Sequence, residues 1–114
     1  MALYEATALP DAPLAASARF HANHLPLIET ALAALDETLT IIFPPGDHTH
    51  RGWRLAVVQE LARQYAPLRI NAVSGDNEAA ISAAVNYLEI AEGVTGQSFL
   101  LVGAGAGAVL SSIR

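Results

Sequence analysis

The sequence contains no cysteine among its 114 residues. This absence excludes disulfide bonds and thiolate chemistry, and it leaves the redox compartment undecided. Aromatic residues are also scarce, at 6% of the chain, although the hydrophobic fraction reaches 53% and much of it is alanine. Alanine packs closely but buries little area per residue. A core so poor in large side chains predicts tight packing of helices on a sheet, with further burial at a subunit interface.

Positive charge is scarce as well. The chain has six Lys and Arg residues and 11 Asp and Glu residues, which gives a formal net charge of −5. The sequence therefore lacks the basic clusters by which proteins recognise nucleic acids or anionic membranes, and we expect neither as a partner.

Residues 1–5 include no basic n-region of a secretory signal, and no apolar run approaches the length that crosses a bilayer. We expect a single cytoplasmic domain over residues 1–114.

Apolar runs and helical spacings alternate along the chain. Strands are expected at residues 2–9, 38–43, 68–73 and 99–102, and helices at residues 15–35, at 49–65 and from Glu78 to a cap at Gly93. Pro26 predicts a kink in the first helix near residues 22–25, because proline removes a backbone hydrogen bond. This alternation predicts an α/β fold, an open parallel sheet of about four strands joined by right-handed crossover helices.

The segment 103–114 begins with five alternating glycines and alanines, which superficially suggest a phosphate-binding turn. Such a turn needs a helix behind it to supply the positive end of a dipole. Only six residues follow Ala108, too few for a useful helix. We therefore interpret residues 103–114 as a Gly/Ala tail that is flexible or docked at an interface.

Four short motifs occur in a characteristic order: Leu61-Ala-Arg, Arg69-Ile-Asn-Ala-Val73, Thr95-Gly-Gln97 and the pair Val102-Gly103. With the small-residue turn at Ser74-Gly75, this order resembles the later half of short-chain dehydrogenases/reductases. The upstream segment Phe20-His-Ala-Asn23 resembles the asparagine-bearing kink of the same family. The resemblance extends over nearly the whole chain. It implies a truncated, Rossmann-like half-domain without the Gly-rich dinucleotide-binding half.

The resemblance also locates the family's four catalytic positions. The serine position falls at Pro44-Pro45, the tyrosine position near Asp47 and the lysine position near Arg51, while Asn23 matches the family asparagine. Proline has no donor for a substrate carbonyl, a free carboxylate is ionised at neutral pH, and arginine holds its proton. We therefore expect no catalytic residue, no cofactor-binding residue and no cofactor. The chain would be a pseudoenzyme related to NAD(P)-dependent oxidoreductases.

The most reactive-looking segment is the polar loop 47–51, which follows an expected strand where open α/β sheets bind ligands. A His-x-His pair beside an aspartate is a candidate site for Zn²⁺ or another divalent metal. The candidate ligands are Asp47, His48 and His50, with His21 or His24 as a further one. We favour a simpler interpretation without metal. The loop is then solvated, Asp47 or Thr49 caps the next helix, and the first helix uses its histidines for packing or at an interface.

The expected strand 2–9 bears on the choice of partners. In the full family this strand lies in mid-sheet, whereas here it would be an edge with unpaired backbone groups. Family members commonly pack two crossover helices across subunits, and these correspond here to residues 15–35 and 49–65. We therefore expect a homodimer or a higher homo-oligomer. A small molecule is left open as a further partner.

Three functions are open at this point. The first, which we favour, is a non-catalytic, homo-oligomeric binding or structural module. The second is a small enzyme or a metal- or ligand-binding protein that uses a strand-end cleft formed by Asn23, Asp47, His48, His50 and Arg51. The third is a half-subunit of a split NAD(P)-dependent oxidoreductase, in which a separate chain supplies the nucleotide-binding half.

Overall fold

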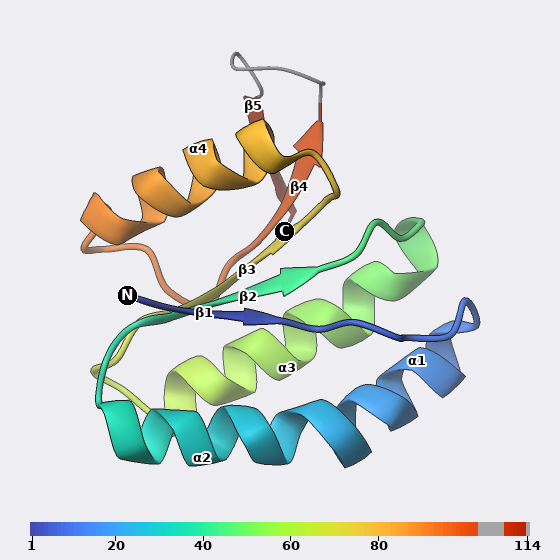
Figure 1. Cartoon of the computed structure of the whole chain (residues 1–114), viewed down its shortest axis with the longest axis horizontal. Coiled ribbons are helices and arrows are strands. Elements are labelled where there is room, and N and C mark those ends of the chain that lie inside the picture. The colour runs from blue at the N-terminus through green and yellow to red at the C-terminus, as the bar shows by residue number, and fades with distance from the viewer. Residues whose placement is uncertain (103–108, 114) are drawn as a thin grey trace.

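A computed structural model describes residues 1–102 and 109–113 of the chain. Helices and strands alternate along it, as Figure 1 shows. In chain order they are β1 (Ala2–Glu5), α1 (Pro13–Arg19), the π-helical turn η1 (Phe20–His24), α2 (Leu25–Leu35), β2 (Leu39–Phe43), the 3₁₀ turn η2 (His48–His50), α3 (Arg51–Gln64), β3 (Ile70–Ser74), α4 (Glu78–Ile90), β4 (Ser98–Val102) and β5 (Val109–Ile113). This order confirms the predicted α/β fold.

The sheet has the strand order β1-β2-β3-β4-β5. The first four strands are parallel, as predicted, and β2 and β3 pair in register from Leu39 with Ile70 to Phe43 with Ser74. Strand β5 pairs antiparallel with β4, and the sequence did not predict it. It lies within the segment expected to be a tail, of which residues 103–108 fall outside the described part of the chain. A five-residue strand shows too little periodicity to be recognised without its partner.

The predicted kink in the first long helix takes the form of the π-helical turn η1, between α1 and α2. Pro26 lies in the first turn of α2, directly after η1, so it has no N–H to donate to the helix where the π-helical turn ends. The turn places the fully buried ring of Phe20 against the sheet, with its centroid 5.4 Å from that of Phe43. At the other end of α2, Asp36 closes the helix in a left-handed conformation.

Helices cover the two faces of the sheet unequally. In Figure 1, α1, α2 and α3 lie on one side of the sheet and α4 lies on the other. The larger core fills the space under the three helices, and its members include Phe20, Ile28, Leu32, Leu39, Ile41, Phe43, Val58, Leu61 and Ile70. The smaller core lies under α4 and contains Val73, Ala84, Leu88 and Phe99. Strand β1 is at one edge of the sheet, as predicted, and 53% of Leu3 is exposed there.

Two of the recognised sequence motifs are in direct contact. Asn71, in the middle of β3, is fully buried and donates from Nδ2 to the carbonyl of Val94 at 2.9 Å. Its Oδ1 accepts from the amide of Gln97 at 3.1 Å. Between these partners, Gly96 has a φ of 72°, a left-handed conformation that glycine adopts without strain. The buried asparagine therefore fixes the Thr-Gly-Gln turn that leads into β4.

Among the helices that the structure describes, none has the length and apolar character needed to cross a membrane.

Candidate functional site

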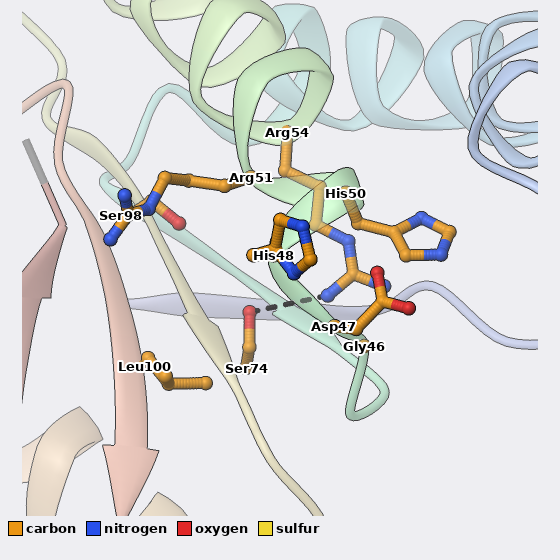
Figure 2. Close-up of a pocket in the computed structure, with 9 residues that line it drawn as sticks. All are labelled: Gly46, Asp47, His48, His50, Arg51, Arg54, Ser74, Ser98 and Leu100. Carbon is orange, nitrogen blue, oxygen red and sulfur yellow. Dashed lines mark hydrogen bonds between the residues drawn. The ribbon is translucent and has the colours of Figure 1, made fainter.

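A cleft of about 120 Å³ opens beside the carboxyl end of β3, between the loop after β2, the start of α3 and strand β4 (Figure 2). It lies where parallel α/β sheets usually bind ligands. The residues that line it are Gly46, Asp47, His48, His50, Arg51, Arg54, Ser74, Ser98 and Leu100. The structure therefore brings together four of the residues that the sequence singled out, in the loop 47–51.

The loop is shaped by its own sequence. Pro44 and Pro45 end β2, because neither can donate a hydrogen bond to a neighbouring strand. Asp47 then caps η2, as predicted. Its Oδ1 accepts from the Thr49 amide at 2.9 Å and also from the Thr49 hydroxyl. These two donors hold the pKa of the Asp47 carboxyl below its usual range. Asp47 is therefore ionised at neutral pH.

His50 is buried and both of its ring nitrogens are engaged. The indole Nε1 of Trp53 donates to Nδ1 at 3.1 Å, and Nε2 donates to the carbonyl of Asp11 at 2.9 Å. In this arrangement His50 has no lone pair available for a metal ion. His48, by contrast, is exposed at the mouth of the cleft. Among the residues that the structure describes, no three His, Asp or Glu side chains are grouped so that they could hold a metal ion. His50 instead attaches the segment before α1 to the start of α3.

The remaining candidates, on η1, do not line the cleft. His24 lies within 2.8 Å of the Tyr4 hydroxyl through Nδ1 and within 2.9 Å of the Thr7 carbonyl through Nε2, which links η1 to the β1 segment. His21 bonds to a backbone carbonyl of its own helix. Asn23 is exposed on η1, so the structure does not bring this family-equivalent asparagine into the cleft.

Arg54 is the cleft residue that the sequence analysis missed. Only 5% of it is exposed, and its guanidinium carbon lies 4.7 Å from the centroid of the Phe43 ring. Nη1 donates to the Pro44 carbonyl at 2.9 Å and to the Ser74 hydroxyl at 3.4 Å, the bond drawn in Figure 2. Nε is buried without a hydrogen-bond partner. Burial lowers the pKa of Arg54 to about 10, so the side chain remains charged at neutral pH.

The sequence did contain a signal for this buried arginine. Arg54 precedes Val57, Val58 and Leu61 by three, four and seven residues, and all three are buried on α3. That spacing marks one face of a helix. A charged residue in register with a buried apolar face is a candidate functional residue, because arginine is rarely buried without a partner.

This arrangement favours binding over proton transfer. The cleft presents two guanidinium groups, from Arg51 and Arg54, with the hydroxyls of Ser74 and Ser98 beside them. Arginine holds its proton at neutral pH, and the carboxylate of Asp47 is already ionised. The lining residues can therefore attract and orient a ligand through charge and hydrogen bonds.

The fold defines a Rossmann-like α/β protein, with a cleft at the carboxyl ends of its parallel strands. A family model described as short chain dehydrogenase-like protein matches residues 4–101. The match covers most of the chain, so this protein belongs to the short-chain dehydrogenase-like family, as the sequence motifs indicated. No curated protein and no solved structure matches the chain significantly.

Proposed function

We propose that this chain is a non-catalytic member of its family, a binding or structural module that assembles with copies of itself. One observation carries the first part of the proposal: the groups at the family's serine and tyrosine positions already accept hydrogen bonds from the loop and from α3. The Pro44 carbonyl accepts from Arg54, and the Asp47 carboxylate accepts from Thr49. Neither position offers a proton to a substrate carbonyl.

The lysine position supports the same proposal. Arg51 is exposed at the mouth of the cleft and retains its charge, so it does not relay a proton as a lysine of lowered pKa can. Asn23, the matching asparagine, is outside the cleft. A proton relay needs its members within hydrogen-bond reach of one another and of the substrate. The four family positions do not form such a chain here.

The self-association part rests on a second surface, the groove between α1–α2 and α3. This groove has a volume of about 290 Å³ and a mostly apolar floor. Its lining residues are Ser17, His21, Leu25, Glu29, Trp53, Ala56, Val57, Glu60, Leu61 and Gln64. On the same helices, Leu14 is 87% exposed and Leu27 is 59% exposed. These are the helices that family members pack across subunits, and a second copy of the chain would cover them.

Cofactor titration tests the non-catalytic assignment. NADH or NADPH is added to the purified chain while the fluorescence of Trp53, the sole tryptophan, is followed for energy transfer to the reduced nicotinamide. We expect no saturable change, and no nicotinamide oxidation with a panel of aldehydes and ketones. A catalytically competent short-chain dehydrogenase serves as the positive control. Saturable binding with hydride transfer would overturn the assignment.

A pair of matched variants tests the self-association surface. Ala56 is exposed in the groove on α3, whereas Ala83 is exposed on α4, on the opposite side of the sheet. Ala56→Arg introduces a long charged side chain into the proposed interface, and Ala83→Arg introduces the same side chain elsewhere. We expect light scattering to show a reduced mass for Ala56→Arg only. Equal masses for both variants and the unmodified chain would exclude this groove as the interface.

The split-oxidoreductase alternative is favoured by one observation, the edge position of β1, because a separate chain could continue the sheet there. The two proposals differ in the behaviour of the isolated chain. A half-subunit kept apart from its partner would remain a monomer with β1 open. A homo-oligomer would instead form from this chain alone.

A further inference from the structure

Arg54 is a buried cation that lacks a counter-ion among the described residues. No carboxylate in the described part of the chain lies within ion-pair distance of it, since the recorded ion pairs join Arg63 to Glu60 and the N-terminus to Glu37. Its own partners are a carbonyl, a hydroxyl and an aromatic face, all of them neutral. Burying a charge under these conditions is costly, because neutral dipoles only partly replace the hydration that is lost.

The cleft places a second cation on the same side. Arg51 precedes Arg54 by three residues on α3, a spacing that puts both on one helix face. Both line the cleft, together with the hydroxyls of Ser74 and Ser98. In Figure 2 the ring of His48 is drawn between the two arginine side chains, above Ser74. The Arg51 guanidinium points toward Ser98 and the Arg54 guanidinium toward Ser74, so the two cations line different sides of the same cleft.

The acidic content of the cleft does not cancel this positive charge. Asp47 is the one carboxylate among the lining residues, and its Oδ1 already accepts from the amide and the hydroxyl of Thr49. Two arginines against one aspartate leave the lining with a net positive charge. Gly46 keeps the space beside Arg54 open, since a Cβ at that position would lie 2.9 Å from Nη2.

We propose that this cleft binds a small oxyanion, a carboxylate or phosphate group, attracted by Arg51 and Arg54 with Ser74 and Ser98 as further donors. Guanidinium groups match the geometry of both oxyanions and form strong, charge-assisted hydrogen bonds with them. The volume of about 120 Å³ exceeds the roughly 10–15 Å³ that one water requires, which leaves room for such a group. The proposal specifies the ligand class of the binding role proposed above and is independent of self-association.

The test uses the ¹⁵N-labelled full chain and follows the Nε–Hε signal of Arg54 by NMR, assigned by its loss in Arg54→Lys. The chain is titrated separately with inorganic phosphate, with acetate and with sodium chloride at matched ionic strength. We expect phosphate, acetate or both to shift the Arg54 signal saturably, and chloride to leave it unchanged. The more effective oxyanion identifies the ligand group as a phosphate or a carboxylate.

Two further variants keep the test informative if the Arg54 variant does not fold. Arg51→Gln removes the exposed cation of the cleft, and Arg63→Gln removes another exposed cation from the same helix outside it. We expect Arg51→Gln to weaken oxyanion binding by roughly tenfold, as loss of a charged hydrogen bond does, and Arg63→Gln to change it by less than about twofold.

The proposal is overturned if no oxyanion shifts the Arg54 signal saturably, or if Arg51→Gln and Arg63→Gln weaken binding equally. The second result would show general screening of charge instead of a defined site. Neither outcome depends on nucleotide affinity or on the mass of the assembly. Failure of the oxyanion site is therefore distinguishable from failure of the non-catalytic assignment or of self-association.

Discussion

The guanidinium carbon of Arg54 lies 4.7 Å from the centroid of the Phe43 ring, so a cation is stacked on the last residue of β2 within the protein interior. The contact joins the first turns of α3 to the end of a central strand. It also places an arginine at the sheet edge where open α/β proteins usually bind ligands. The charge of Arg54 is therefore better explained by function than by stability.

Replacing this arginine tests that explanation. Arg54→Met keeps a long side chain against Phe43 and removes a buried charge that has no acidic partner. We expect the free energy of unfolding to stay within about 1 kcal/mol of the original value or to rise, as when apolar residues replace buried charges. Urea unfolding followed by circular dichroism measures the difference.

Arg69→Met is the matched control. The Nη1 of Arg69 donates to the carbonyls of Leu88 and Ala91 at the end of α4, both at 2.8 Å. Loss of these bonds should cost about 1–3 kcal/mol. A larger loss for Arg54→Met than for Arg69→Met would contradict a functional reason for Arg54.

Replacing glycine by alanine should have opposite effects on stability at two positions near the cleft. Gly46→Ala would place a Cβ 2.9 Å from Nη2 of Arg54 and 3.2 Å from Cδ2 of His50. Both neighbours are buried, so we expect a loss of about 1–2 kcal/mol from overpacking, together with weaker oxyanion binding. Gly52→Ala meets nothing within 4 Å on α3 and should stabilise the chain by up to about 1 kcal/mol. Thermal unfolding of the two variants gives the comparison.

Acid should weaken the loop that Asp47 caps. The pKa of Asp47 is lowered from 3.8 in the folded chain by the Thr49 hydroxyl and amide, so the unfolded state binds its proton at higher pH. Its contribution to stability is complete above the unfolded pKa and is lost as pH falls through the folded pKa. Asp47→Asn keeps the cap without this titration, so its stability should fall less steeply as the pH drops below the unfolded pKa of the aspartate. Asp76→Asn, in another exposed loop, is the control, and an identical change in slope for both variants would contradict the assignment.

The buried amide of Asn71 predicts a structural role for the recognised motif. Asn71→Ala would leave the Val94 carbonyl and the Gln97 amide without their side-chain partner. We expect a cost of about 2–3 kcal/mol in urea unfolding, with an unchanged slope. Asn86→Ala, on the exposed side of α4, should change stability by no more than about 0.5 kcal/mol. Similar values for both variants would mean that the turn before β4 does not depend on this amide.

The fold was predictable because its central strands are mostly apolar. Leu39–Phe43 and Ile70–Ser74 are buried on both faces of the sheet, and such strands differ clearly in composition from the amphipathic helices between them. Strand β5 was not predictable in the same way. It consists of five residues beyond a glycine-alanine segment, and its pairing with β4 depends on the fold as a whole.

The loop of the candidate site could be predicted from the sequence, but the contacts of its buried side chains could not. The polar segment 47–51 follows a strand end, so its place at the cleft and the cap at Asp47 could be inferred from the sequence. The engagement of His50 could not, because its partner carbonyl at Asp11 lies 39 residues earlier. Arg54 was missed because a charged helix residue is usually solvated, and its burial is decided by packing on Phe43.

Sedimentation velocity of the purified, unmodified chain, over a wide range of concentrations, is the sharpest test of the proposed self-association. A chain that buries the groove beside α3 against a second copy should not persist as separate subunits. We expect a folded species with at least twice the 11.9 kDa mass of one chain, stable on dilution to low micromolar concentration. A folded monomer at every concentration would contradict it.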